Sequence, residues 1–356
     1  MRQTVVITGS SGLLGEALAE RLGPDFTVVG LDVVAPSEDA PIDLSLHFDV
    51  TSDMSVRDAL DRIRMEYGRN LAAVVHLAAY YDFGGDPSPL YDEVTVEGTR
   101  RLLRHLRKQD FALDRFVFTS TMLVHGPVKP GDRIDEDSPL DARWPYPESK
   151  LDTEGVIREE RGDYPSAFLR IAGVYTDHGG QPTLVQQIKR IHSQDFNSFF
   201  FPGDSEAGQA IVHLDDAVDA IVRTVERRRD LPEEAEILIG EPDPMSYAEL
   251  QDEIGEHLWG AEWPTIRVPE GMAKAGAWVQ DRVPGGDSFI KPYMIELADD
   301  HYALDISRAR ELLDWEPRHD FRAELPGILD QVRENPEEWY KKNGLDMPED
   351  AVGAFD

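Results

Sequence analysis

Cysteine is absent from the 356 residues of this chain. Its absence excludes disulfide bonds, zinc sites built on thiolates and iron–sulfur clusters. It also excludes a cysteine nucleophile and a cysteine acid/base. Any reaction that depends on such a group is therefore closed to this chain.

Long hydrophobic runs are also missing. No stretch approaches the ~20 uninterrupted apolar residues that a membrane-spanning helix needs, and the N-terminus leads directly into a strand-like segment without a charged-then-apolar signal sequence. We therefore expect no membrane partner and a cytoplasmic location. With 41% hydrophobic residues, a chain of this length has room for one large core with a smaller lobe attached.

Lysine is scarce and acidic residues are in excess. Asp and Glu number 69 against 36 Lys and Arg, which gives a formal net charge of -33. We expect no nucleic-acid partner, because binding nucleic acid depends on Lys and Arg that neutralise phosphates. An acidic surface repels itself in dilute buffer but is screened in molar salt, where the Debye length is about 3 Å. The composition indicates a halophilic cytoplasmic protein, and the alternative is an acidic enzyme of a mesophile.

The first half of the chain alternates short β-branched runs with amphipathic stretches. This alternation is typical of parallel strands joined by crossover helices, the doubly wound α/β architecture of the Rossmann type. The expected strands lie near 3–8, 27–32, 72–77, 114–120 and 166–171, and the expected helices near 11–22, 53–66, 87–108 and 146–160. Beyond residue 175 the alternation loosens, with a strand-like segment at 210–214 and a helix from about 215.

This organisation predicts two domains. Residues 1–175 form the doubly wound domain, which would carry the cofactor and the catalytic residues. Residues 176–345 form mainly a smaller substrate-binding lobe over the carboxyl edge of the sheet, where ligands of such folds bind. Some segments of the second half are expected to return to the first domain.

A glycine-rich loop stands between the first strand and the first helix. It reads Thr8-Gly9-Ser10-Ser11-Gly12-Leu13-Leu14-Gly15, and glycines at such a junction let the backbone turn tightly and approach a pyrophosphate at the helix N-terminus. The second strand ends at Asp32, whose carboxylate is placed to accept hydrogen bonds from the adenosine ribose. Because this carboxylate repels a 2′-phosphate, the pattern favours NAD over NADP.

Three further residues suit acid/base chemistry. Tyr146 and Lys150 are four residues apart in a predicted helix, so they share one face. A nearby ammonium favours the phenolate of a tyrosine, whose unperturbed pKa is near 10, which makes Tyr146 the expected acid/base. Thr121, at the end of a predicted strand, is placed to hydrogen-bond the substrate oxygen and to hold the reacting carbon toward the nicotinamide.

These motifs, in this order, resemble those of the extended short-chain dehydrogenase/reductases, the group that includes NAD-dependent epimerases and dehydratases. The resemblance runs over about residues 1–330 and implies a Rossmann-type domain that binds NAD. It implies catalytic roles for Thr121, Tyr146 and Lys150. The implied cofactor contacts are Gly9, Ser11, Gly12, Leu13, Leu14, Gly15, Asp32, Asp49, Val50, Leu77, Ala78, Ala79, Thr95, Thr119, Tyr146, Lys150 and Ala172.

Departures from the family's patterns narrow the reaction. The 4,6-dehydratases resemble one another in a Thr-Asp-Glu at the catalytic strand end, where this chain has Thr121-Met122-Leu123, and the proton-abstracting epimerases use a cysteine. Members that hold a sugar diphosphate tend to have an asparagine and an arginine where this chain has Gly173 and Gln209-Ala210. We therefore expect a smaller or less charged substrate.

Aromatic and histidine side chains supply candidates for the substrate pocket. Tyrosine and tryptophan offer flat apolar faces with a polar tip, which sugars and ring alcohols need. The predicted substrate-binding residues are Tyr80, Tyr81, Thr121, Trp144 and His213, with His178 and Tyr293 as further candidates. No metal is expected, because the histidines and carboxylates lack a ligand spacing such as His-Glu-x-x-His.

Three functions remain open. The first is an NAD-dependent dehydrogenase or reductase that acts on a secondary alcohol or lactol carbon of a small sugar-like or alicyclic molecule. The second is a sugar or nucleotide-sugar 4-epimerase that works through a transient ketone. The third is a non-catalytic dinucleotide-binding or assembly protein.

The family resemblance also implies a homodimer. Its members commonly pair through two long helices, here those near 87–108 and 146–160. Leu102, Leu103 and Leu106 are candidate contacts with the partner, and packing of these leucines on the chain's own sheet is the alternative.

Overall fold

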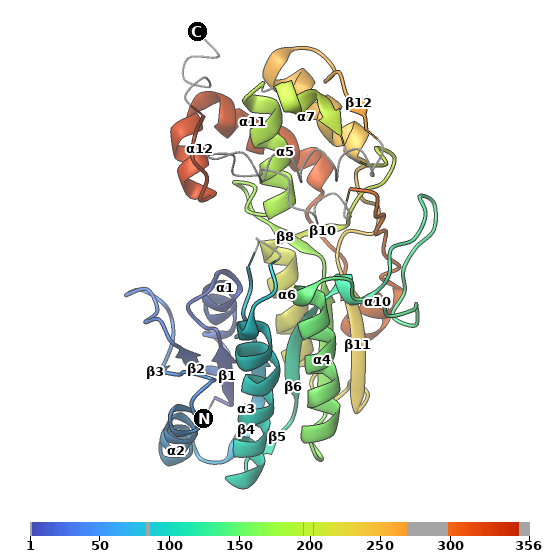
Figure 1. Cartoon of the computed structure of the whole chain (residues 1–356). Coiled ribbons are helices and arrows are strands. Elements are labelled where there is room, and N and C mark those ends of the chain that lie inside the picture. Colours follow the sequence, from blue (N-terminus) through green and yellow to red (C-terminus); the bar gives the residue numbers. More distant parts are fainter. Residues whose placement is uncertain (1, 83–85, 195, 202, 269–297, 349–356) are drawn as a thin grey trace.

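The structure is a computed structural model that describes residues 2–82, 86–194, 196–201, 203–268 and 298–348. Figure 1 shows a large lobe built around a sheet and a smaller, mostly helical lobe, with strands β8 (Gly173–Tyr175) and β10 (Ile211–His213) between them. Among the described residues, no helix combines the length and the apolar character needed to cross a membrane.

The sheet of the large lobe is parallel in every pairing. Its path runs β11-β7-β6-β4-β1-β2-β3, and a short strand, β5 (Ala112–Leu113), pairs with β4. The strands on the path are β1 (Thr4–Thr8), β2 (Thr27–Asp32), β3 (Leu44–His47), β4 (Asn70–His76), β6 (Phe116–Thr121), β7 (Ser166–Ile171) and β11 (Glu234–Ile239). The strand order reverses between β1 and β4, at the switch point where such sheets bind ligands. The predicted Rossmann-type doubly wound sheet is confirmed.

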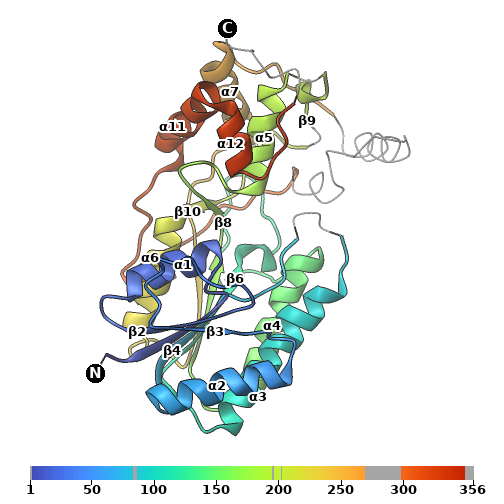
Figure 2. The ribbon, with the colours of Figure 1, turned by 90° about the vertical axis from the view of Figure 1, so that its left-hand side faces the viewer.

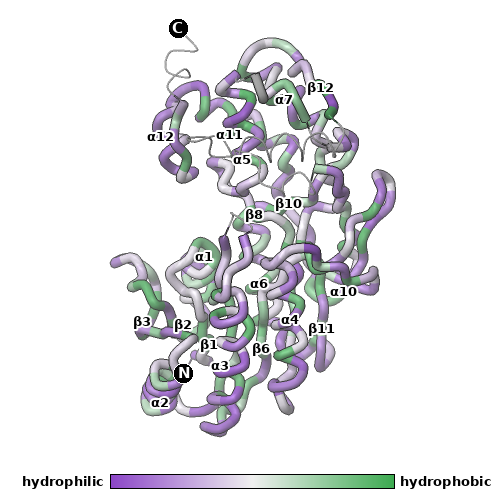
Figure 3. Tube along the Cα trace, viewed as in Figure 1, coloured by the Kyte–Doolittle hydropathy of each residue, from purple (hydrophilic) through white to green (hydrophobic). Residues whose placement is uncertain are grey.

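Helices cover both faces of this sheet (Figure 2). One face carries α1 (Leu13–Leu22), α6 (Leu214–Glu226) and α10 (Ser307–Leu313), and the other carries α2 (Asp53–Tyr67), α3 (Glu97–Lys108) and α4 (Pro145–Glu160). Side chains alternate along β1 as a strand requires, so that Val5 and Ile7 join the first apolar layer and Val6 the second. Figure 3 shows the resulting contrast between the largely apolar central strands and the mixed helices.

The three candidate leucines for a dimer contact belong to the chain's own core. Leu102, Leu103 and Leu106 are at most 1% exposed and pack in the cluster beneath α2 and α3. The alternative, that these leucines pack on the chain's own sheet, is therefore the correct one. Their side chains are not available to a partner subunit.

The predicted elements of the first half agree with the structure to within a few residues. The segment expected as one helix over 87–108 begins with a π-helical turn, η1 (Tyr91–Val96), which continues into α3. Three strands of the large sheet, β3, β5 and β11, were not predicted. β11 lies at the edge of the sheet and carries Glu234 and Glu236, which interrupt its apolar run.

The smaller lobe has an apolar cluster of its own. Ile188, Ile254, Leu329 and Trp339 share it, and they come from α5 (Pro182–His192), α7 (Tyr247–Trp259), α11 (Phe321–Glu334) and α12 (Pro336–Lys342). A short parallel pair joins β9 (Phe200–Phe201) to β12 (Ile266–Arg267), and the 3-10 turn η3 (Phe196–Phe199) precedes β9. A further 3-10 turn, η2 (Met122–Val124), lies in the large lobe directly after β6. The functional division of the chain at residue 175 remains a prediction.

Candidate active site

A cleft of about 470 Å³ opens at the carboxyl ends of β1, β2 and β4. Its position is the switch point of the sheet, where a ligand is expected. Its walls are formed by Gly9, Ser11, Gly12, Leu31, Asp32, Val33, Val34, Phe48, Asp49, Val50, Thr51, Leu77, Ala78, Ala79 and Val94. Nine of these were predicted as cofactor contacts: Gly9, Ser11, Gly12, Asp32, Asp49, Val50, Leu77, Ala78 and Ala79.

Two glycines allow the loop at the cleft to fold. Gly9 has φ = 73°, a left-handed conformation that glycine adopts readily, and a Cβ there would lie 2.9 Å from the Ala78 nitrogen. A Cβ at Gly15 would lie 2.2 Å from the Gly9 carbonyl oxygen. Helix α1 has Gly12 as its N-cap and no side-chain cap, so its first N–H groups are available to the phosphates of a dinucleotide.

Asp32 is fixed in the cleft wall by two backbone N–H groups. Its Oδ2 accepts a hydrogen bond of 2.9 Å from Ser11 and its Oδ1 one of 3.0 Å from Val34. Each carboxylate oxygen has a further lone pair, which suits the hydroxyls of a ribose. The residues present therefore fit the adenosine half of NAD.

An apolar wall beyond Asp32 was missed in the sequence. Val33 and Val34 are 57% and 63% exposed, and they face the cleft together with Phe48 and Val50. Ligand sites are mostly lined by apolar side chains, and such a wall suits the flat adenine ring. In the sequence, these two valines could be recognised only by their position directly after Asp32. They were missed because apolar residues at a strand end usually belong to the core.

Some predicted cofactor residues do not line this cleft. Leu13 is exposed at the start of α1, and Leu14 packs partly against the core. Thr95 accepts the N–H of Tyr80 at 2.9 Å, and Ala172 follows the end of β7. The cofactor roles of Leu13, Leu14, Gly15, Thr95, Thr119, Tyr146, Lys150 and Ala172 remain predictions.

A buried histidine braces the strand that ends beside the cleft. The Nδ1 of His76 lies 2.7 Å from the Thr8 hydroxyl and its Nε2 lies 2.8 Å from the Thr99 hydroxyl. Burial lowers the pKa of His76 to about 3, so the ring is neutral at physiological pH. His76 therefore positions β4 against β1 and α3 and is not an acid/base.

The structure brings Thr121, Tyr146 and Lys150 together where β6 ends and α4 begins. The side chain of Thr121 lies close enough to that of Tyr146 to favour the phenolate and so to lower its pKa. The Lys150 ammonium donates a hydrogen bond of 2.9 Å to the carbonyl oxygen of Thr119 and lies 5.9 Å from the centre of the Tyr146 ring. The three side chains predicted to act together thus form one polar group at the end of a strand.

Burial dominates the protonation of this group. It raises the pKa of Tyr146 above its usual value. The neighbouring Tyr81 raises this pKa further, and the Thr121 side chain lowers it. Burial also lowers the pKa of Lys150 to about 8. Burial is the largest cause of the raised Tyr146 pKa, and the expected lowering of this pKa by Lys150 remains a prediction.

Two of the predicted substrate residues lie beside Tyr146, at the start of α4. The Tyr81 ring packs edge-on against Tyr146, with 5.0 Å between centroids and 81° between planes. Trp144 is the N-cap of α4, two residues before Tyr146. Tyr80 instead packs against Tyr91 at 4.8 Å, and Tyr293 lies outside the described residues.

His213 and His178 have partners in the smaller lobe. The His213 ring stacks on His319 at 3.8 Å, and the Nδ1 of His178 lies 2.6 Å from the Gln331 side-chain oxygen. No structural contact links either histidine to Tyr146 among the described interactions, so the substrate role of His213 remains a prediction.

His213, His319 and Glu324 bring potential metal-ligand atoms within 4.8 Å of one another. The Nδ1 of His213 accepts the N–H of Asp215 at 3.2 Å, so the neutral ring carries its proton on Nε2, 3.3 Å from Asp177. A metal ion can bind Nε2 only if the proton moves from Nε2 to Nδ1. That change would break the hydrogen bond that Nδ1 accepts from Asp215, so this tautomer of His213 disfavours metal binding. We assign no metal to the cluster.

Comparison with known proteins identifies the family. The sequence profile described as NAD dependent epimerase/dehydratase family matches residues 5–240. The N-acetyl-alpha-D-glucosaminyl-diphospho-ditrans,octacis-undecaprenol 4-epimerase of Escherichia coli O157:H7 is 32% identical over 163 residues, which cover 45% of this chain and only 44% of that protein.

Two further relatives are matched over nearly their whole length. A decarboxylating sterol-4-alpha-carboxylate 3-dehydrogenase from Candida albicans is 24% identical and is covered to 98%, with 94% of this chain. The low-salt glycan biosynthesis protein Agl12 from Haloferax volcanii is 25% identical and is covered to 97%, with 92% of this chain.

Solved structures share the fold. MoeE5 in complex with UDP-glucose and NAD has a TM-score of 0.67 at 22% identity, and the likeness covers 94% of this chain and 100% of that one. The family profile matches more than half of the chain. This match establishes the family to which the chain belongs and the cofactor that the family uses. The expected resemblance is confirmed: this chain belongs to the NAD dependent epimerase/dehydratase family, of the extended short-chain dehydrogenase/reductase type, and its cofactor is NAD.

Proposed function

We propose that this enzyme transfers a hydride between NAD(H) and a secondary alcohol or lactol carbon of a sugar-like or alicyclic substrate. Tyr146 is the acid/base, assisted by Lys150 and Thr121. The observation that carries the proposal is the contact of Tyr81 with Tyr146. Leu77, Ala78 and Ala79 line the cofactor cleft, and the chain then runs within two residues to Tyr81, so the cleft wall leads directly to the catalytic group.

The chemistry of the residues follows from their contacts. The cleft residues Gly12 and Asp32 would hold NAD, which would supply a hydride acceptor for oxidation of the carbinol carbon and a hydride donor for the reverse reduction. The phenol oxygen of Tyr146 takes the hydroxyl proton as the alcohol is oxidised and gives it back to the carbonyl oxygen in the reverse direction. The hydroxyl of Thr121 donates a hydrogen bond to the same substrate oxygen and so fixes the distance of that oxygen from Tyr146.

The raised pKa of Tyr146 makes the protonated phenol the resting form. A protonated phenol is the form that reduces a carbonyl, while oxidation requires a positive charge nearby to favour the phenolate. Lys150 supplies that charge, and its ammonium is held in place by the carbonyl of Thr119.

The substrate we propose carries no diphosphate. A small cavity beside β10 and α5 is lined by neutral side chains, among them Gln181, Gln187, Gln209 and Tyr247. A Cβ at Gly173 would lie 3.0 Å from the Gln181 amide nitrogen, so an amide occupies the place over this glycine. Neutral amides can bind hydroxyls and carbonyls, but they do not balance two phosphate charges.

A 4-epimerase is the second candidate. It is favoured by the names of two relatives, the undecaprenol-linked sugar 4-epimerase of Escherichia coli and the UDP-glucose 4-epimerase of Bacillus subtilis. Such an enzyme oxidises and reduces the same carbon within one turnover and releases no NADH. The neutral side chains of Gln181 and Gln209 support a substrate without a diphosphate, and they do not bear on epimerisation itself.

We further propose a halophilic, cytoplasmic homodimer in which residues 1–175 bind NAD and residues 176–345 mainly bind substrate. The net charge of -33 supports the salt requirement, and the separate apolar cluster of the smaller lobe supports the division. Ion pairs within the chain, such as Arg100–Glu159 and Arg104–Glu160, join α3 to α4. We propose that the charged outer surfaces of these two helices, and not their buried leucines, contact the partner subunit. Sedimentation in molar KCl tests the dimer.

The proposed function is tested by a substrate screen in 2 M KCl. NADH absorbance is followed with NAD and a panel of aldoses, uronic acids, cyclic alcohols and nucleotide sugars, and product sugars are analysed for inversion. Tyr146→Phe removes the acid/base oxygen, and Tyr164→Phe is the matched control, because the Tyr164 hydroxyl donates to the Phe111 carbonyl in the core.

The dehydrogenase predicts NADH with one substrate class in the wild type and the control, and none with Tyr146→Phe. Inversion without net NADH would establish the epimerase instead. A protein that binds NAD, turns over none of the panel and leaves every sugar unchanged would favour the non-catalytic alternative.

A further inference from the structure

Three consecutive residues at the end of β6 each bind a different residue of α4. The carbonyl oxygen of Thr119 accepts a hydrogen bond of 2.9 Å from the Lys150 ammonium. The hydroxyl of Ser120 donates a hydrogen bond of 2.7 Å to the Glu154 carboxylate. The side chain of Thr121 interacts with that of Tyr146. The helix and the strand are thus joined through side chains at three successive points.

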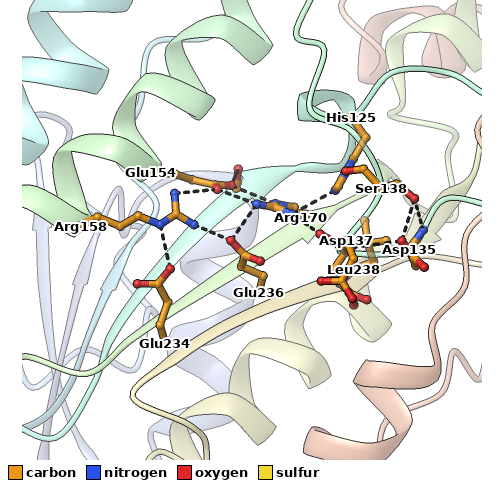
Figure 4. A network of polar contacts seen from close by, with 12 residues as sticks. His125, Asp135, Asp137, Ser138, Glu154, Arg158, Arg170, Glu234, Glu236 and Leu238 are labelled. Carbon is orange, nitrogen blue, oxygen red and sulfur yellow. Dashed lines mark hydrogen bonds and ion pairs between the residues drawn. The ribbon is translucent and has the colours of Figure 1, made fainter.

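The partner of Ser120 is a fully buried carboxylate. Glu154 is 0% exposed and follows Lys150 by four residues, one turn further along α4. It also accepts two hydrogen bonds from Arg170 of β7, of 3.2 Å from Nε and 2.8 Å from Nη2 (Figure 4). A paired, bidentate carboxylate of this kind is held in one geometry.

Arg170 is held as tightly as Glu154. Besides the two bonds to Glu154, its Nη atoms donate to His125, to the carbonyl of Glu136 and to Glu236. A guanidinium has five N–H donors, so these five bonds use all of them. Arg170 therefore has one orientation, and it transmits that orientation to Glu154.

From this arrangement we infer that the Glu154–Arg170 pair positions the catalytic turn of α4 on β6. Glu154 and Arg170 touch neither the cofactor cleft nor the reacting atoms, and they act through Ser120 and the helix that carries Tyr146. This inference rests on the proposed function, because it assigns to the pair the spacing of the three catalytic side chains.

The charge of the pair argues against a role in stability alone. A buried ion pair is costly to desolvate, and well-packed apolar residues of similar volume are often as stable. Apolar residues, however, cannot fix the direction of the Ser120 hydroxyl. They also cannot fix the orientation of the face of α4 that carries Tyr146 and Lys150. Because a displacement of about 1 Å can cost 10²-fold in rate, a rigid link at this point is expected to affect kcat.

The test compares Glu154→Gln and Ser120→Ala with Glu234→Gln. Glu234 makes the same kind of ion pair at the outer end of the network, with Arg158 at 2.8 Å, and has no contact with β6 among the described interactions. Active enzyme is counted by the stoichiometry of NAD binding, and the primary isotope effect is measured with substrate deuterated at the carbinol carbon.

We expect Glu154→Gln and Ser120→Ala to lower kcat per NAD-binding site at least about tenfold and to raise the isotope effect, with the Kd of NAD within about twofold of wild type. Since the two residues act as one unit, the double variant is expected to lose little more than Glu154→Gln alone. A variant that is merely destabilised contains fewer active molecules, and those that remain keep the wild-type isotope effect. Glu234→Gln is expected to behave as wild type.

The inference is overturned if Ser120→Ala and Glu154→Gln, folded and binding NAD, keep the wild-type kcat and isotope effect, or if Glu234→Gln loses as much. Failure of the proposed function is distinct, since the wild type would then turn over none of the panel. In that case hydrogen exchange of residues 145–152 decides. Faster exchange in both variants but not in Glu234→Gln supports the positioning role, and equal exchange contradicts it.

Discussion

Lys150 is tied to Thr119 by a hydrogen bond of 2.9 Å from its ammonium to the backbone carbonyl. The ammonium is buried, with no carboxylate among its described hydrogen-bond or ion-pair partners. A single carbonyl compensates only part of the desolvation of a charge, which is why burial lowers the pKa of Lys150 to about 8. Lys150 is therefore a buried charge that lowers the stability of the fold.

The first prediction concerns Lys150→Met. The native pKa lies below that of an unfolded lysine, so the penalty for the charge is full below pH 8 and is relieved as the pH rises toward 10.5. Since one pKa unit corresponds to about 1.4 kcal/mol, the substitution is expected to stabilise the fold by up to about 3 kcal/mol at pH 7 and by little at pH 10.5, while activity is lost. Urea unfolding at the two pH values measures this difference.

Lys129→Met is the control for this experiment, because Lys129 is exposed and its replacement is expected to change stability equally at both pH values. A Lys150→Met variant that is less stable than wild type at pH 7 would show that the Thr119 hydrogen bond contributes more than the buried charge costs.

The second prediction concerns cofactor choice. Asp32 offers its carboxylate to the ribose position while holding Ser11 and Val34, so Asp32→Asn removes the charge but keeps the side chain's size. We expect the affinity for NAD to fall by about 10- to 150-fold, since hydrogen bonds to a charged group contribute about 1.5–3 kcal/mol, and we expect the affinity for NADP to rise. Calorimetric titration of both dinucleotides measures the two changes.

Asp39→Asn, on the exposed segment after the same strand, carries the same charge change away from the cleft. If it alters the two affinities as much as Asp32→Asn does, the effect comes from the overall charge of the protein and not from a contact with the ribose.

The sequence was most informative where function depends on neighbours in the chain. The strand–glycine loop–helix order places Gly9, Gly12 and Asp32 at one cleft, and the spacing of Tyr146 and Lys150 on one helix is a local property. Apolar periodicity likewise predicted most strands of the large lobe. These features require no knowledge of how distant segments pack.

The features that were missed depend on packing between distant segments. The stacking of His213 on His319 joins residues more than a hundred positions apart, and the Gln181 amide over Gly173 is not a sequence motif. The raised pKa of Tyr146 reflects mainly burial, which depends on how distant segments pack around the ring. The charged edge strand β11 resembles a surface segment until Arg158 and Arg170 are seen to pair with Glu236.

The third prediction compares two helical glycines. A Cβ at Gly15 would meet the Gly9 carbonyl at 2.2 Å, whereas a Cβ at Gly155 meets nothing within 4 Å. Gly15→Ala is therefore expected to displace the loop, to abolish measurable NAD binding and to lower the Tm. Gly155→Ala is expected to keep NAD binding and to stabilise the fold by about 0.5–1 kcal/mol, as alanine does in a helix. Equal effects of the two substitutions would show that the loop adapts to the extra methyl group.

The fourth prediction concerns salt. With a net charge of -33, the folded chain concentrates like charges that the unfolded chain spreads apart, and salt screens their repulsion. We expect the Tm to rise by on the order of 10 °C between 0.1 and 2 M KCl, which for a chain of this size corresponds to several kcal/mol. Sucrose at the same osmolality separates screening from the general stabilisation by excluded solutes, because it leaves the charges unscreened. A Tm that is flat in KCl, or that rises equally in sucrose, would disconnect the acidic surface from a salt requirement and leave the mesophilic alternative as the better account.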